Sequence, residues 1–268
     1  MRYALHEHNN AFNWSMPGGV PTHVTQAQWA QFDTHGFLAW EDAFDAGEVA
    51  DVLAAIDPLE AAAEQELRSR SNGRRWISRA DEITFRPHLV LKDATLAAFC
   101  RHPVLLGLCA DLIGPDVRLY WDQCVYKKPG MPEEFPWHQD NGYTFVEPQH
   151  YLTCWIALTD ATEHNGCPWI APGLHRLGTL HHDYTEFGFR CLDAVEDAVA
   201  VPLRAGSIAV FSSLTPHRTG PNLTSATRKA YIVQYAPEGA CIRRPDGGRE
   251  LCAVPERQFL VLRNAQPV

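Results

Sequence analysis

The chain has 268 residues, and 46% of them are hydrophobic, which is the composition of a globular protein long enough to bury a sizeable core. Its formal net charge of −9 disfavours a nucleic-acid partner, because a phosphate backbone would be repelled. No segment is apolar enough to cross a bilayer, and the opening stretch, MRYALHEHNN, lacks a signal-peptide core. We therefore expect a cytoplasmic protein without a membrane partner, whose eight cysteines are free thiols.

The first third of the chain is predicted to be mainly helical. Two of its capping residues are followed three positions later by glutamine or glutamate, which is the capping-box pattern of a helix start. Glycine and proline mark the expected ends. The four expected helices run from Thr25 to Gly36, from Asp45 to about Leu67, from Asp93 through "ATLAAFC", and from His102-Pro103 to Gly114.

From Val117 onward, the apolar residues repeat every second position, as in β-strands. Further strands are expected at 151–159, 167–172, 198–203, 207–211 and 228–236. Turns rich in proline and glycine separate them without intervening helices, which favours an antiparallel sandwich or barrel over a parallel sheet. We expect one domain, with a helical support region (1–115), a β core (116–240) and a C-terminal extension (241–268).

The segment FPWHQDNGYTF places two metal-ligand types two positions apart. His138 and Asp140 would point to the same side of an extended segment, and a third donor would complete a site. Two histidines and one carboxylate leave open positions on octahedral Fe(II). His217, in "TPHRTGPN", is the predicted third ligand.

Two competing histidines have to be weighed. Because the chain has 13 histidines, one H-x-D pair is expected by chance, and a second pair exists at His181 and Asp183. That second pair lies in "LHHDYTEFGFR", where no strand period is apparent. His175, in "APGLHR", is a rival third ligand that we interpret as a turn residue.

Several sequence blocks resemble one known family. "WHQD", "NGCPWIAPGLHR", "AGSIAVFSSLTPHRTGPNLT" and Arg228 are together similar to the phytanoyl-CoA dioxygenase family of Fe(II)/2-oxoglutarate oxygenases, over about residues 85–236. The resemblance implies a mainly β fold, a double-stranded β-helix (cupin-like jelly roll) with N-terminal helices against one sheet. It also implies Fe(II), 2-oxoglutarate as co-substrate and O2 as oxidant.

The resemblance assigns roles residue by residue. His138, Asp140 and His217 match the metal ligands, which are also the catalytic residues. Arg228 matches the arginine that binds the distal carboxylate of 2-oxoglutarate, and a guanidinium fork suits that partner. The remaining expected co-substrate contacts are Thr219, Gln123 and Trp155, and the expected substrate contacts are Trp137, Asn141, Tyr143 and Phe145.

The favoured function is oxidation of an unactivated C–H bond of a bulky, largely apolar small molecule, by hydroxylation or a related epimerisation or cyclisation, in bacterial secondary metabolism such as antibiotic biosynthesis. Large aromatic faces near His138 suggest this substrate class. The 181–190 segment is expected to act as a lid.

Three alternatives stay open. An acyl-CoA hydroxylase would need a basic patch, which a group of arginines offers (Arg68, Arg70, Arg74, Arg75 and Arg79). A non-catalytic cupin-like binding protein would be free to lose Arg228 or a metal ligand, and neither is lost. A metal-dependent cupin enzyme that uses no keto acid would have no need of Arg228 and Thr219.

Overall fold

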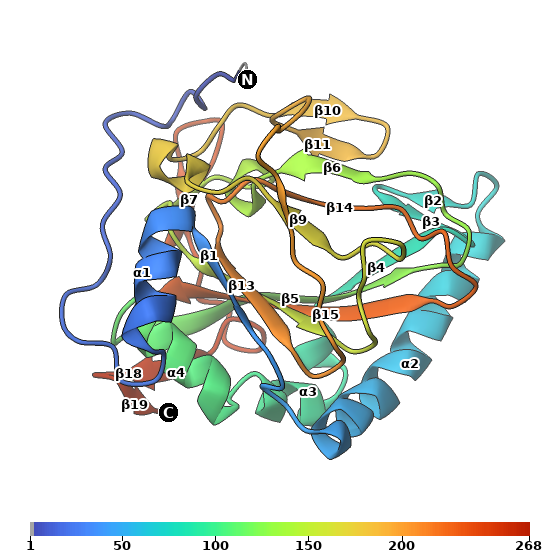
Figure 1. Cartoon of the computed structure of the whole chain (residues 1–268), viewed down its shortest axis with the longest axis horizontal. Coiled ribbons are helices and arrows are strands. Elements are labelled where there is room, and N and C mark those ends of the chain that lie inside the picture. Colours follow the sequence, from blue (N-terminus) through green and yellow to red (C-terminus); the bar gives the residue numbers. More distant parts are fainter. Residues whose placement is uncertain (1–2) are drawn as a thin grey trace.

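A large antiparallel sheet dominates the computed structural model, which describes residues 3–268 (Figure 1). Its strand order is β1-β13-β8-β15-β5-β4-β3-β2, and β18 and β19 attach beside β5. The bounds are β1 (Phe37–Trp40), β2 (Arg74–Arg75), β3 (Ser78–Arg79), β4 (Ile83–Pro87), β5 (Val117–Lys127), β8 (Leu152–Ala157), β13 (Ile208–Ser212), β15 (Arg228–Pro237), β18 (Leu260–Arg263) and β19 (Gln266–Pro267).

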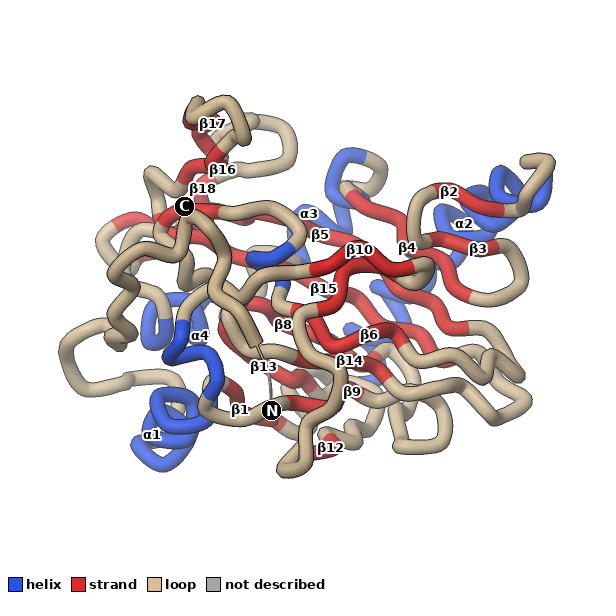
Figure 2. The backbone as a smooth tube through the Cα atoms, turned by 90° about the horizontal axis from the view of Figure 1, so that it is seen from above, coloured by secondary structure: helices blue, strands red, loops and turns tan. Residues whose placement is uncertain are grey.

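A smaller antiparallel sheet lies across from the large one. Seen from above, β6, β14 and β9 run side by side (Figure 2). This sheet has the order β12 (Val199–Ala200), β9 (Pro168–Ile170), β14 (His217–Thr219) and β6 (Phe135–His138). The remaining strands form a hairpin, β10 (Asp183–Thr185) with β11 (Gly188–Arg190), and a three-stranded sheet of β7 (Val146–Glu147), β16 (Cys241–Arg243) and β17 (Arg249–Leu251). The predicted mainly β jelly roll is confirmed.

The helices begin where the sequence predicted. They are α1 (Gln26–His35), α2 (Ala46–Ser69), α3 (Ala94–Phe99) and α4 (Pro103–Leu112), with short 3-10 turns η1 (Leu89–Leu91), η2 (Asp140–Gly142) and η3 (Leu174–Leu177). Both expected capping boxes are present, and Gly36 ends α1 at a φ of 81°. No helix within residues 3–268 is both long and apolar enough to span a bilayer.

Two cores use opposite faces of the large sheet. Along β15, Tyr231 and Val233 pack in a cluster with side chains of α2 and α4, whereas Ala230 and Ile232 pack toward the smaller sheet. In Figure 1, α2, α3 and α4 accordingly lie along the outer side of the large sheet. The inner face is left to line the space between the sheets.

The structure corrects the predicted elements at two places. Four strands, β1 to β4, precede residue 117, where the sequence predicted none. The segment around His181 contains the hairpin β10–β11, although no strand period was apparent there. These strands have only two to five residues each, which is too short for an alternating pattern to stand out. All eight cysteines are free thiols, as predicted.

Candidate metal centre

The structure brings His138, Asp140 and His217 together. His138 ends β6 and lies directly opposite His217, the first residue of β14, while Asp140 begins the short turn η2. Asp140 Oδ1 lies 3.8 Å from His138 Nε2 and 3.7 Å from His217 Nε2. One possible ligand atom from each residue lies within 4.8 Å of the others, which is the spacing that a single metal ion requires.

Backbone carbonyls fix how both imidazoles point. His138 Nδ1 lies 2.8 Å from the carbonyl oxygen of Pro136, and His217 Nδ1 lies 3.0 Å from that of Thr215. Because a carbonyl only accepts, each Nδ1 carries the hydrogen and each Nε2 keeps its lone pair. Both lone pairs are therefore available on the side where Asp140 lies, as metal-binding histidines require.

Burial sets the protonation of the three groups. It lowers the pKa of His138 to about 3, with a further contribution from the neighbouring His217, and it lowers the pKa of His217 to about 4. It raises the pKa of Asp140. Neutral imidazoles are the form that binds metals, and a divalent cation would stabilise the buried carboxylate. The donor set therefore fits Fe(II), with positions left open for other ligands.

A hydrogen-bond chain holds the carboxylate in place. Thr153 Oγ1 donates to Asp140 Oδ2 over 2.6 Å, and Gln234 Nε2 donates to Thr153 Oγ1 over 3.2 Å. Sequence analysis missed both residues. Gln234 follows Arg228, Ala230 and Ile232 at a period of two, so extending the predicted inner face of β15 would have found it.

The triad lines an inner cavity of about 50 Å³, and Arg228 lines the same cavity. Arg228 is fully buried, and its Nη1 donates to the carbonyl oxygen of Val125 over 3.1 Å, whereas Nε and Nη2 have no partner among the described residues. Burial lowers the pKa of Arg228 to about 10. Unpaired buried N–H groups are costly, and their fork matches a carboxylate, so the site fits the distal end of a keto diacid.

The other predicted co-substrate residues line the same inner cavity. Thr219, Gln123 and Trp155 all contribute to its wall. The guanidinium of Arg228 lies over the Trp155 ring, 5.1 Å from its centroid. Trp155 therefore forms one side of the cavity and also contacts the cation.

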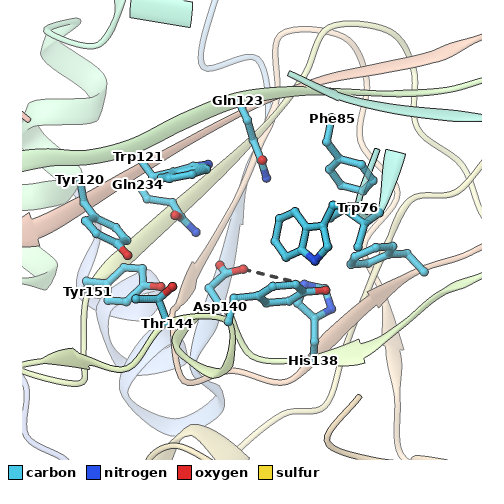
Figure 3. A pocket seen from close by; sticks show the side chains of 13 residues that line it. Trp76, Phe85, Tyr120, Trp121, Gln123, His138, Asp140, Thr144, Tyr151 and Gln234 are labelled. Atoms are coloured by element: carbon cyan, nitrogen blue, oxygen red, sulfur yellow. Dashed lines mark ion pairs between the residues drawn. The ribbon is translucent and has the colours of Figure 1, made fainter. Parts of the chain in front are cut away.

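An outer cavity of about 140 Å³ opens from the triad, and aromatic side chains form most of its wall (Figure 3). Gln123 and Phe85 reach in from the large sheet, opposite His138. Apart from His138 and Asp140, the described residues that line it are uncharged at neutral pH. The lining consists of Trp76, Ile77, Phe85, Tyr120, Trp121, Gln123, Phe135, His138, Asp140, Tyr143, Thr144, Tyr151 and Gln234.

Of the four predicted substrate residues, only one lines the inner or the outer cavity. Tyr143 does, and its ring also contacts His138. Trp137 packs in an apolar cluster with Leu180 and Leu192, because alternation along β6 turns it away from His138. Phe145 stacks on His6, at 4.7 Å between ring centroids.

Asn141, the fourth of these residues, is fully buried and braces a turn. Its side chain accepts from the backbone N–H of Val146 and donates to Thr179 Oγ1 over 2.7 Å. Both polar atoms of the Asn141 side chain thus have hydrogen-bond partners within the protein. The geometry gives Asn141 a structural role.

The competing histidines lie outside this site. His175 is fully buried in η3, where Nε2 lies 3.1 Å from the carbonyl oxygen of Asp33. His181 and Asp183 form an exposed pair at 3.4 Å, and no third ligand joins them within residues 3–268. The sequence-based choice of triad therefore agrees with the one cluster of possible metal ligands in the described part of the chain.

Trp76 and Phe85 were not predicted as lining residues. Trp76 is 60% exposed, and its backbone φ of 53° lies in the left-handed region, which is unfavourable for a bulky side chain. It lines both the outer cavity and a groove of about 240 Å³ beside α2. No periodic pattern could have found Trp76, because it lies in the tight turn between β2 and β3.

The backbone at Gly166 lies close to that of Gly220, so a substitution at Gly166 tests how much this turn contributes to stability. Its φ is 93°, and a Cβ there would lie 2.7 Å from the carbonyl oxygen of Gly220. We expect Gly166→Ala to lower the free energy of unfolding by about 2 to 4 kcal/mol, measured in urea. Gly130→Ala, at a φ of 70° with nothing within 4 Å, is the control and should cost only about 1 to 2 kcal/mol. Equal losses would show that the contact with Gly220 is unimportant.

Comparisons with known proteins agree with this geometry. The family model described as Phytanoyl-CoA dioxygenase (PhyH) matches residues 32–230. A phytanoyl-CoA dioxygenase of Arabidopsis thaliana is 29% identical over 143 residues, which cover 51% of this chain and 50% of the relative. A methylphosphonate hydroxylase of Gimesia maris is 35% identical over 125 residues, with 46% and 47% covered. The chain thus spans about half the length of these two relatives.

One solved structure extends the likeness over most of the chain. The non-heme alpha ketoglutarate dependent carbocyclase SnoK from nogalamycin biosynthesis has a TM-score of 0.69 over 84% of this chain and 90% of its own. The two sequences are 24% identical, so this likeness concerns the fold.

Proposed function

Because this chain belongs to the phytanoyl-CoA dioxygenase family, we propose that it is an Fe(II)- and 2-oxoglutarate-dependent oxygenase of a small, largely apolar molecule. The main support for this proposal is the set of side chains that line the inner cavity. The cavity that contains three convergent metal ligands also contains a buried guanidinium with two unpartnered nitrogens. A metal ion would satisfy the first group and a keto diacid the second.

In the proposed reaction, each of these side chains would have a separate role. His138, Asp140 and His217 hold the metal, and bound Fe(II) supplies the activation of O2 that couples decarboxylation of 2-oxoglutarate to oxidation of a C–H bond. Arg228 and Thr219 orient the distal carboxylate of the co-substrate. Thr153 holds Asp140, and the aromatic wall excludes bulk water from the reacting atoms.

The residues that line the outer cavity favour an uncharged, ring-containing substrate. Aromatic faces suit ring systems, and a phosphonate or zwitterion would need fixed ionic partners that the lining does not offer. A volume of about 140 Å³ is small for a bulky molecule. We therefore propose that such a substrate also uses the groove behind Trp76, and that it comes from bacterial secondary metabolism, with hydroxylation, epimerisation and cyclisation as candidate outcomes.

An acyl-CoA substrate is less well supported, because carboxylates already occupy the arginine group. Arg68 binds Glu64 and Asp81, Arg70 and Arg75 bind Glu66, Arg74 binds Glu186, and Arg79 binds Glu82. A CoA phosphate would have to displace these partners. The arginines are thus paired with carboxylates and do not form a free basic patch.

Turnover tests the proposed activity directly. Succinate release under air, with Fe(II) and a panel of ring compounds, should rise with the right compound. An acyl-CoA thioester belongs in the same panel. Tight 2-oxoglutarate binding without succinate release from any compound would contradict the proposed substrate class.

Trp76 should control which compounds enter. Trp76→Ala should weaken the binding of compounds that the wild type accepts by about tenfold in KM, since an aromatic contact is lost, and should admit larger ones. The measurement is succinate release across the panel. Leu223→Ala, at a similarly exposed position outside both cavities, should behave as the wild type. An unchanged compound range in Trp76→Ala would remove Trp76 from the substrate site.

A further inference from the structure

Two buried basic side chains lie side by side next to the inner cavity, and one of them, Arg228, lines it. Lys127, the last residue of β5, pairs directly with Arg228, the first residue of β15, and both side chains are fully buried. Like charges opposite each other in a sheet repel, and each buried charge also loses hydration. Burial and the neighbouring charge of Arg228 lower the pKa of Lys127 well below its usual range, so this lysine carries a charge most readily when an anion is close. This pair is therefore costly unless an anion binds nearby.

The nitrogen of Lys127 is surrounded by acceptors. It lies 3.3 Å from Thr219 Oγ1 and 3.5 Å from the carbonyl oxygen of Thr219, and it also contacts the carbonyl oxygen of Gly220. When an anion in the cavity keeps Lys127 protonated, its ammonium only donates, so the Thr219 hydroxyl accepts from it. The hydrogen of that hydroxyl is then free to point elsewhere, and Thr219 lines the inner cavity together with Arg228.

We infer that Lys127 is a positioning residue for the distal carboxylate of 2-oxoglutarate, and that it acts through Thr219. Its contact fixes the Thr219 hydroxyl as a donor toward the carboxylate, while its charge supplements that of Arg228. Lys127 thereby favours a keto acid with a second carboxylate over one without it. This inference rests on the proposed function.

A purely structural role makes a different prediction. The aliphatic part of Lys127 packs against the turn at Gly166, since a Cβ on Gly166 would lie 3.2 Å from Lys127 Cδ. If Lys127 only supported this turn, its loss would disturb all ligands of the cavity alike. A positioning role affects only ligands that carry the distal carboxylate.

The test compares two keto acids of equal chain length. The dissociation constants of 2-oxoglutarate and 2-oxovalerate are measured by calorimetry under nitrogen with the Mn(II)-loaded protein. Lys127→Met, which removes the charge and keeps the length, should weaken 2-oxoglutarate binding about tenfold to a hundredfold. Binding of 2-oxovalerate should change less than about threefold, because this ligand has no distal charge to lose. Lys229→Met, one position beyond Arg228 and paired with Asp57, is the charge-matched control and should leave both constants unchanged.

A second variant keeps the test decisive if Lys127→Met does not fold. Thr219→Val keeps the size of the side chain and removes the hydroxyl, and it should show the same selective loss. Wild-type affinity for 2-oxoglutarate in either folded variant, or equal losses for both keto acids, would overturn the inference. Failure of the wild type itself to bind 2-oxoglutarate would instead contradict the proposed function.

Discussion

Replacing Asp140 with alanine should abolish metal-dependent turnover and weaken metal binding at least about a hundredfold, because even the loss of an outer hydrogen-bond partner of a ligand commonly costs that much. Asp140 is the only carboxylate among the three convergent ligands of the described residues, and it lies between the two imidazole Nε2 atoms. Without it, two neutral histidines would remain. Equilibrium dialysis with Mn(II), followed by metal analysis, measures the effect.

The second H-x-D pair provides the matched control. Asp183→Ala removes a carboxylate two positions after a histidine, as Asp140→Ala does, but at a site that is exposed and has no third ligand. This control variant should bind metal and turn over like the wild type. If Asp140→Ala retained full metal affinity while Asp183→Ala lost it, the metal would lie at the hairpin β10–β11.

Replacing Arg228 with methionine should weaken 2-oxoglutarate binding by about a hundredfold or more, since a carboxylate would then be buried without its partner. Calorimetry with the Mn(II)-loaded variant under nitrogen measures this change. Metal binding itself should persist, because Arg228 lines the inner cavity without being one of the three ligands. Unchanged 2-oxoglutarate affinity would show that the co-substrate binds elsewhere.

The same variant should not lose stability in the absence of ligands. Arg228 is buried with two unpartnered nitrogens, and it faces Lys127, so a neutral side chain of similar length relieves both costs. We expect Arg228→Met to unfold in urea at the same midpoint as the wild type or at a higher one. A large loss of stability would mean that Arg228 supports the fold and not primarily a ligand.

Local signals explain how much of the fold could be predicted from sequence. The helix starts at Thr25 and Asp45 depend on contacts within four residues, so their capping boxes could be recognised without any tertiary information. The long strand β15 could be recognised because both of its faces are buried, which gives a long, mostly apolar run in the sequence. Short strands such as β2 and β3 depend on pairing partners distant in sequence, and no local pattern identifies them.

Some residues of the candidate site could likewise be predicted from the sequence, and others could not. The triad was predictable because H-x-D motifs and the distant His217 occur in a recognisable order, and resemblance to a family placed Arg228. The lining of the outer cavity was not predictable, because proximity to His138 in sequence does not mean proximity in space. Trp137 alternates away from the cavity, whereas Phe135 lines it, since the β6–β14 pairing shifts register between His217 and Thr219.

The central claim is that one cavity binds a metal and a keto diacid together. Its most direct test is calorimetric titration of 2-oxoglutarate under nitrogen into the metal-free and the Mn(II)-loaded protein. We predict one 2-oxoglutarate bound per chain, with affinity that depends on the metal, because the triad and Arg228 would hold opposite ends of the same molecule. Equal affinity with and without the metal, or no binding in either form, would contradict the account.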